Sequence, residues 1–146
     1  MTEPDITKLH LDRPGIRAAL GDLEAEIMDL VWQRAVGEGI TVREVWGEIY
    51  PKRAIMYTTV MNTMTRLARK GLLATDREER AYLYSATVSR EEFVDRFVGG
   101  TLERLLVNFG GATLAHLKRL DDPALHERVA RLLEDIERRR GDEEND

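Results

Sequence analysis

The chain of 146 residues contains no cysteine, which excludes disulfide bonds and thiolate metal sites and gives no sign of an oxidising compartment. It also lacks any apolar run close to the roughly 20 residues that a membrane-spanning helix needs. The N-terminal residues do not show the basic and then apolar pattern of a signal peptide. We therefore expect a cytoplasmic protein that is not inserted in a membrane.

Groups for catalysis are also scarce. The three histidines, His10, His116 and His126, are not paired with a second ligand at a metal-binding spacing. There is no glycine-rich phosphate loop, and no histidine stands beside a plausible nucleophile. The sequence therefore predicts a protein that is not an enzyme and that has neither a cofactor nor a metal site.

Acidic residues exceed basic ones over the whole chain, but not along its middle. From Arg43 to Arg90 there are nine Lys/Arg and five Asp/Glu, a local charge of +4, and since the net charge is −5 the remainder carries −9. Attraction to phosphates acts over about a Debye length, roughly 8 Å at physiological salt. The middle of the chain can therefore bind a polyanion although the whole protein is acidic.

The stretch from Met56 to Ser85 combines an amphipathic helix with a hairpin. The apolar side chains of residues 58–70 gather on one side of such a helix: Val60, Met61, Met64, Leu67 and Ala68. Gly71 is expected to end this helix in a left-handed cap. Thr75 and the Tyr82–Tyr84 alternation predict short strands, which are joined by the polar tip Asp76–Arg80. This order predicts a winged helix-turn-helix.

Two further helices are predicted before this stretch. Asp22 is expected to cap the first, Leu23–Val36. Thr41 and Glu44 form a capping box for the second, which Pro51 ends by disfavouring helical backbone in the preceding residue.

The polar side of the predicted helix and its neighbours offer groups that suit DNA. Asparagine and arginine make bidentate contacts to bases, whereas threonine hydroxyls and lysines suit phosphates. A solvated helix face is the alternative, but a helix followed at once by an arginine-bearing hairpin favours DNA. The residues expected to contact DNA are Lys52, Arg53, Thr58, Thr59, Asn62, Arg66, Arg69, Lys70, Arg77 and Arg80.

Three helices are predicted after the hairpin. Ser89 and Glu92 form a second capping box, and the helix that it starts passes Gly99-Gly100, where a bend is expected. A shorter helix is expected over Ala112–Leu120. Asp122-Pro123 provides an N-cap, followed by proline at the first position of the last helix.

These helices carry more apolar positions than they can cover alone, so the sequence predicts that they hold a homodimer. The expected dimer contacts are Phe93, Phe97, Leu102, Leu105, Leu106, Leu114, Leu117, Leu125, Val129, Leu132 and Ile136. The predicted fold class is mainly α: a winged helix-turn-helix with a small β-hairpin, and a three-helix C-terminal dimerisation segment. The expected domains are a loosely ordered arm at 1–19, a DNA-binding domain at 20–88, the dimerisation segment at 89–140 and an acidic tail at 141–146.

Four separated motifs resemble the penicillinase repressor (BlaI/MecI) family: LGDLEAEIMDLVW, TVREVW, YTTVMNTMTRLARKGLL and RAYLYSATVSREEF. They cover about half of the chain. The resemblance implies a homodimeric winged-helix transcriptional repressor that binds a palindromic DNA operator. The family's copper-responsive branch has a cysteine-rich tail, and that mechanism has no counterpart here.

In family members that are paired with a membrane sensor-protease, cleavage of an Asn-Phe bond ends repression. This chain has Asn108-Phe109 in the corresponding region. Two interpretations stay open for this dipeptide: a cleavage site, or a helix end where Asn108 caps and Phe109 packs.

Two other functions also stay open. The first is a winged-helix protein-interaction module that does not bind DNA. The second is a ligand-sensing regulator with a pocket between the DNA-binding domain and the dimerisation segment.

Overall fold

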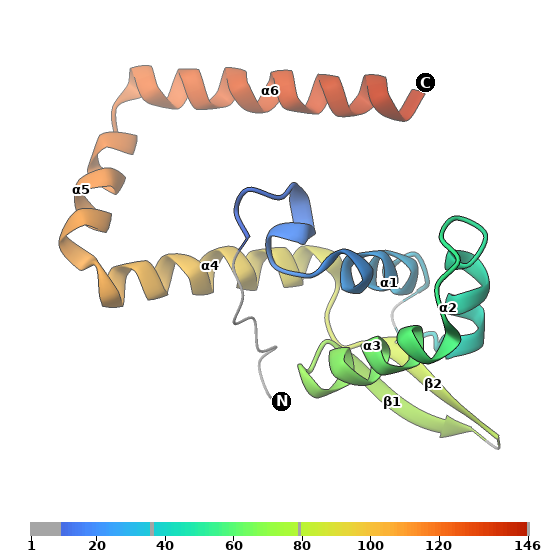
Figure 1. The fold of residues 1–146 in the computed structure, drawn as a ribbon. Coiled ribbons are helices and arrows are strands. Elements are labelled where there is room, and N and C mark those ends of the chain that lie inside the picture. The colour runs from blue at the N-terminus through green and yellow to red at the C-terminus, as the bar shows by residue number, and fades with distance from the viewer. Residues whose placement is uncertain (1–9, 36, 79, 146) are drawn as a thin grey trace. The chain divides into compact units, whose positions relative to one another are not determined.

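The computed structural model describes residues 10–35, 37–78 and 80–145. The chain divides into an N-terminal unit that ends at Val98 and a C-terminal unit that begins at Gly99. This division falls within a helix, and the boundary at residue 89 between a DNA-binding domain and a dimerisation segment stays a prediction. In chain order the elements are the 3-10 helix η1 (Gly15–Ala18), α1 (Asp22–Trp32), α2 (Val42–Ile49), α3 (Tyr57–Arg69), β1 (Leu73–Glu78), β2 (Ala81–Ala86), α4 (Arg90–Asn108), α5 (Gly110–Leu120) and α6 (Pro123–Asn145) (Figure 1).

This mainly helical fold with one antiparallel hairpin confirms the predicted fold class. None of the helices in the described ranges is long and apolar enough to cross a membrane.

The core of the N-terminal unit takes side chains from every element of that unit. Ile27 and Met28 of α1, Val45 of α2 and Met64 of α3 are each 0% exposed. The sequence predicted a loosely ordered arm over residues 1–19. Part of it is ordered, because Ile16 of η1 is also buried in this core. Residues 1–9 lie outside the described residues.

The first helix begins and ends differently from the prediction. Gly21, not Asp22, is the N-cap, and its N–H donates to Glu24 Oε1 at 3.2 Å, so the Glu24 carboxylate satisfies an amide that lacks a helical partner. The helix ends at Trp32. The predicted end, Val36, lies outside the described residues.

The capping box of α2 is confirmed. Thr41 Oγ1 accepts from the N–H of Glu44 at 3.1 Å, and Glu44 Oε1 accepts from the N–H of Thr41 at 3.3 Å. The indole N–H of Trp46 then donates to the Ile55 carbonyl at 3.0 Å. This bond ties α2 to the turn that leads into α3, so the helix-turn-helix is held by a side chain as well as by core packing.

The helix α3 ends as predicted. Gly71 has φ +83°, the left-handed region that glycine adopts without a steric penalty. Its N–H donates to Ala68 O at 3.1 Å, and the N–H of Leu72 donates to Leu67 O at 3.0 Å. These two bonds form a Schellman motif, which turns the chain directly into β1.

The hairpin is longer than predicted. Leu73 pairs with Ala86, and the register continues to Glu78 and Ala81, so most of the expected polar tip lies within β1. Ile40, before α2, adds a short bridge to the sheet through two backbone hydrogen bonds to Tyr84 of 2.8 and 2.9 Å. The bridge therefore fastens β2 of the hairpin to the segment that leads into α2.

The start of α4 packs into the N-terminal unit. Ser89 Oγ accepts from the N–H of Glu92 at 3.1 Å, as the second capping box predicts. Phe93 is only 1% exposed, and the centre of its ring lies 5.4 Å from the centre of the Trp32 ring. Because Phe93 belongs to this core, the prediction that it is a dimer contact is corrected.

The three predicted C-terminal helices are present. The helix α4 continues through Gly99-Gly100, and the break comes at Phe109, with α5 starting at Gly110. Asp122 Oδ1 accepts from the N–H of Ala124 at 3.0 Å, as expected for an N-cap of α6. The predicted tail after residue 140 is helical as far as Asn145.

Candidate nucleic-acid interface

The side of α3 that faces away from the core carries the groups that the sequence singled out. The N-terminal unit buries Val60, Met64 and Leu67 of this helix at 0% exposure. The opposite side is exposed along the whole helix and bears Thr58, Thr59, Asn62, Arg66 and Arg69. The structure therefore brings five of the ten expected contacts together on one face, which we call the outer face of α3.

Two more basic residues lie in the turn before α3. The N–H groups of Lys52 and Arg53 both donate to Ile49 O at 3.0 Å, so the turn is closed by its own backbone. Both side chains are exposed, and the guanidinium of Arg53 lies 3.5 Å from Glu26 Oε1. Part of the charge of Arg53 is thus balanced within the protein.

Lys70 does not join the outer face of α3. Its Nζ donates to Glu24 Oε2 at 2.8 Å, and the Glu24 side chain is only 12% exposed. This pair fastens the end of α3 to the start of α1. The structure therefore pairs the Lys70 ammonium group within the N-terminal unit, while 31% of its side chain stays exposed.

The two hairpin arginines differ in position. Arg77 lies in β1, with its guanidinium carbon 6.0 Å from the centre of the exposed Tyr82 ring on the paired strand. Arg80 precedes β2 and is exposed. The guanidinium group of Arg77 is thus close enough to an aromatic ring for a cation–π contact.

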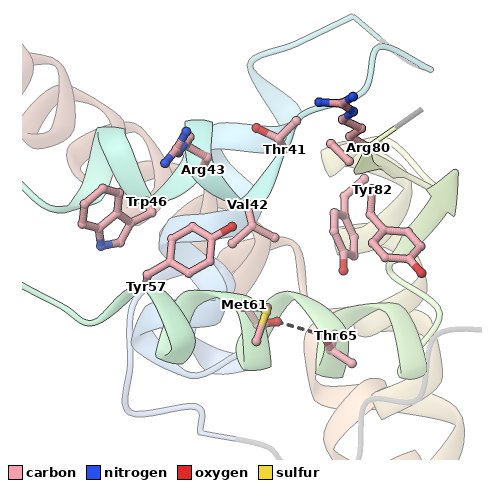
Figure 2. A pocket seen from close by; sticks show the side chains of 11 residues that line it. Thr41, Val42, Arg43, Trp46, Tyr57, Met61, Thr65, Arg80 and Tyr82 are labelled. Carbon is pink, nitrogen blue, oxygen red and sulfur yellow. Dashed lines mark hydrogen bonds between the residues drawn. The ribbon is translucent and has the colours of Figure 1, made fainter. Parts of the chain in front are cut away.

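An open groove of about 860 Å³ lies beside the outer face, between α2, α3 and β2. Arg43 and Arg80 lie along one side of the groove in Figure 2. The other side is formed by α3, with Tyr57, Met61 and Thr65. The sequence placed Met61 with the core, but it is 38% exposed, because α3 turns this edge of its apolar stripe toward the groove.

Of these groove residues, the sequence analysis singled out only Arg80 as a binding residue. The four-residue spacing of Tyr57, Met61 and Thr65 was available as a signal, because it places them in one row on a helix. Arg43 entered only the charge count. The groove itself could not be predicted from the sequence, because its other wall is β2, and the packing of β2 beside α3 depends on contacts between distant residues.

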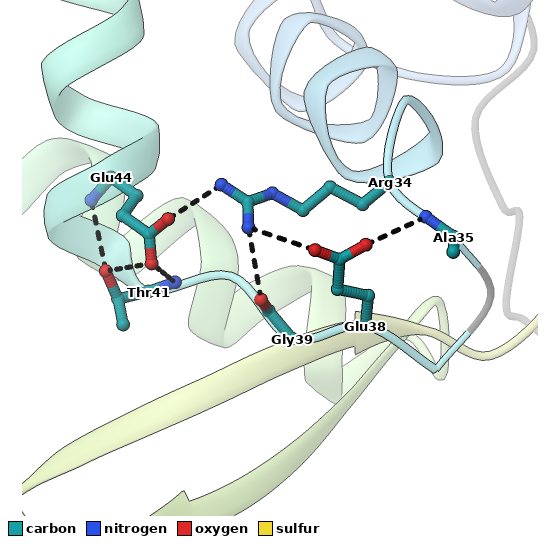
Figure 3. Close-up of polar contacts among 6 residues, drawn as sticks. All are labelled: Arg34, Ala35, Glu38, Gly39, Thr41 and Glu44. Atoms are coloured by element: carbon teal, nitrogen blue, oxygen red, sulfur yellow. Dashed lines mark hydrogen bonds and ion pairs between the residues drawn. The ribbon is translucent and has the colours of Figure 1, made fainter.

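A network of charges closes the side of α2 that faces the loop after α1. Arg34 lies 2.7 Å from Glu44 Oε2 and donates to Gly39 O at 3.5 Å, as Figure 3 shows. Partial burial acts to raise the pKa of Glu44, but the hydrogen bonds from Thr41 and Arg34, with the charge of Arg34, outweigh it and lower the pKa. Glu44 is thus ionised at neutral pH, and it shares the guanidinium of Arg34 with Glu38, whose Oε1 lies 3.8 Å from Arg34 Nη1.

The C-terminal unit carries a different kind of surface. Of the side chains that the structure describes from Gly99 onward, none is buried. Six of the expected dimer contacts are exposed by between 37% and 60%: Leu102, Leu105, Leu114, Val129, Leu132 and Ile136. Leu106, Leu117 and Leu125 are half-buried, and Phe97 packs against the core of the N-terminal unit.

The Asn108-Phe109 dipeptide marks the break between α4 and α5. The side-chain amide of Asn108 donates to Arg104 O at 2.8 Å, so it does bond a carbonyl at the helix end. Phe109 is 66% exposed and does not pack as one of the two interpretations expected. Its N–H still donates to Leu105 O at 2.7 Å.

Comparison with known proteins gives a family match over most of the chain. The family model described as "Penicillinase repressor" matches residues 20–138. The chain is 43% identical over 75 residues to a protein named transcriptional regulator BlaI of Mycobacterium tuberculosis, which covers 51% of this chain and 53% of that protein. It thus spans about half the length of this relative.

Two other similarities cover smaller shares of the chain than the family model does. A penicillinase repressor of Bacillus licheniformis is 26% identical over 98 residues, covering 62% of this chain and 74% of that protein. The solution structure of the DNA-binding domain of the repressor BlaI has a TM-score of 0.43 and 26% identity, and covers 48% of this chain and 82% of that one.

Proposed function

The chain belongs to the penicillinase repressor family, and from this we propose that it represses transcription by binding a palindromic DNA operator as a homodimer. One observation supports the DNA contact most strongly. Five polar or basic side chains occupy the exposed side of α3, opposite the buried Val60, Met64 and Leu67. A helix with such a face, followed at once by a hairpin, is the arrangement that winged helices use on a major groove and its flanking backbone.

The proposed contacts divide by chemistry. Asn62 and Arg66, in the middle of the outer face of α3, have the geometry for bidentate contacts to bases. Lys52, Arg53, Arg77 and Arg80 supply positive charge for phosphates, which accounts for affinity and for its dependence on salt. Since the Lys70 charge is paired with Glu24, we leave it out of the interface.

A binding selection tests this function. The full-length protein is mixed with a library of random duplexes, and the bound fraction is sequenced over several rounds. We expect enrichment of one palindromic sequence, and an affinity for it that falls steeply with salt. If no sequence is enriched and a gel shift on the DNA upstream of the protein's own gene is negative, the protein does not act as a DNA-binding repressor.

The homodimer is proposed from the exposed apolar surface of the C-terminal unit. Leu125, Val129, Leu132 and Ile136 recur at spacings of four, three and four along α6, as in a short coiled coil. Such a row is too short to be stable alone in water, and a second copy offers the same row by symmetry.

The oligomeric state of two full-length variants tests this proposal. Leu132→Asp puts a charge into the row and should give a monomer at micromolar concentration in sedimentation. Ala130→Asp adds the same charge on the other side of α6 and should leave the dimer intact. A dimer that survives Leu132→Asp would contradict the proposed surface.

Proteolytic release is proposed at Asn108-Phe109, through a membrane sensor-protease. The exposed Phe109 and the two glycines after it favour access, and a Cβ at either glycine would meet nothing within 4 Å. Because the Phe109 N–H is bonded to Leu105 O, the last turn of α4 must open before the peptide bond can enter a protease cleft.

A cut at this bond would remove α5 and α6 and leave the DNA contacts unchanged. Separated DNA-binding units lose the effective concentration that links them, so operator affinity should fall by about 10²-fold or more. The test introduces a specific protease site after Asn108 and compares mass and operator affinity before and after the cut. A cut protein that stays dimeric and binds equally well would exclude this route of induction.

A further inference from the structure

The groove between α2, α3 and β2 is mostly apolar, although it borders the outer face of α3. Trp46, Tyr57 and Met61 line it from the helices, and Tyr82 and Tyr84 line it from the hairpin. Surface apolar side chains gathered in a hollow are typical of a binding surface. The outer face itself has no such group, because its side chains are threonine, asparagine and arginine.

The row of side chains along α3 offers methyl groups to this groove. Met61 is 38% exposed. The hydroxyl of Thr65, one turn further, donates to Met61 O at 2.9 Å (Figure 2). Since its proton is used within the helix, Thr65 presents mainly its methyl group to a partner. The α3 side of the groove therefore suits an apolar group better than a hydrogen-bonding one.

The charges around the groove favour a DNA strand as its occupant. Arg43 and Arg80 line it, and none of the described lining residues is acidic. The nearest carboxylate along α2, Glu44, is paired with Arg34 at 2.7 Å. A phosphate backbone would thus meet two arginines at the rim of the groove, while the bases beside it would meet methyl and aromatic groups.

We propose that Met61, together with the methyl group of Thr65, determines specificity by contacting the 5-methyl group of a thymine in the operator. Among the base edges in the major groove, only thymine carries a methyl group, so an apolar side chain can recognise thymine there. The inference rests on the proposed DNA-binding function and adds to it a base contact outside the polar face. It assigns thymine to one position of each half-site, beside the base contacted by Asn62 or Arg66.

Replacing thymine by uracil tests this contact, because uracil lacks only the methyl group. Once the selection has given an operator, each thymine is replaced in turn and the affinity of the full-length protein is measured by fluorescence anisotropy. We expect one thymine in each half-site whose replacement lowers affinity by about fourfold, the value of one buried methyl group. Met61→Ala, which keeps the methyl group of Thr65, should lower the affinity difference between the thymine and uracil duplexes to less than about twofold, whereas Met61→Leu should keep the full difference.

Met56→Ala is the matched control. Met56 is 70% exposed and lies outside the groove, so this variant should discriminate thymine from uracil as the wild type does. If no thymine is sensitive, or if Met61→Ala keeps full discrimination, the proposal is overturned although the protein binds DNA. A selection that yields no operator would instead overturn the proposed function itself.

Discussion

Replacing Phe93 by alanine separates two possible roles of this side chain. If Phe93 belongs to the core of the N-terminal unit, as its 1% exposure and its 5.4 Å contact with Trp32 indicate, the variant should lose stability and not dimer affinity. Removing a buried phenylalanine costs about 3 to 5 kcal/mol, since the lost transfer energy adds to the cost of the cavity. The total free energy of unfolding of a native protein is about 5 to 15 kcal/mol.

Urea unfolding followed by tryptophan fluorescence measures this loss, because Trp32 lies against the substituted ring. Because a loss of this size can leave little folded protein, Phe93→Leu is made as well. It keeps most of the side-chain volume and should cost about 1 to 2 kcal/mol. Both variants should sediment as dimers under conditions in which they are folded.

Leu132→Ala gives the opposite pattern and serves as the comparison. This side chain is 60% exposed in the C-terminal unit, so its loss should weaken the dimer and leave the unfolding of the N-terminal unit unchanged. The assignment of Phe93 to the core would be refuted if Phe93→Ala unfolded at the wild-type urea concentration while dissociating the dimer.

Three further outcomes follow from the described contacts. Arg66→Ala should cost about 1 to 3 kcal/mol and relax preference at one operator position, whereas Lys52→Ala should weaken all sequences alike and reduce the salt slope by about one; a selection repeated with each variant checks this. Trp46→Phe, which removes the 3.0 Å bond to Ile55 O, should cost about 1 kcal/mol in urea unfolding, and an unchanged midpoint would contradict the role of that bond. Because folding lowers the pKa of Glu44, the ionised carboxylate stabilises the fold at any pH above the unfolded pKa of about 4.5. The wild type should therefore be more stable than Glu44→Gln at pH 7, and this advantage should disappear as the pH falls through the folded pKa. Urea midpoints of both proteins between pH 7 and pH 3 test this, and a constant difference between the midpoints would contradict it.

Local chemistry made much of the fold predictable from the sequence. The Thr41–Glu44 capping box and the left-handed Gly71 depend on neighbours within a few residues, and the structure has both. The amphipathic period of α3 likewise separated Val60 and Leu67 from the polar side. In each case the determining contacts are close in the chain, where spacing defines the geometry.

Contacts between distant residues were not predictable in this way. Lys70 has the positive charge expected of a DNA contact, but its ammonium group pairs with Glu24, which lies 46 residues away in the chain. Phe93 looks like any apolar residue near a helix start, and only the packing of α4 against Trp32 assigns it to the core. Met61 sits at the edge of the apolar stripe, so its exposure depends on where the hairpin packs and not on period alone.

A footprint of the full-length protein on its selected operator tests repression by a DNA-bound dimer most directly. Hydroxyl-radical cleavage should reveal two protected segments whose centres are a whole number of helical turns apart, about 10 base pairs or a multiple. Titration of the same duplex should saturate at two chains per operator. One protected segment with one chain per duplex, or protection that Asn62→Ala and Arg66→Ala leave unchanged, would contradict binding by a dimer through α3.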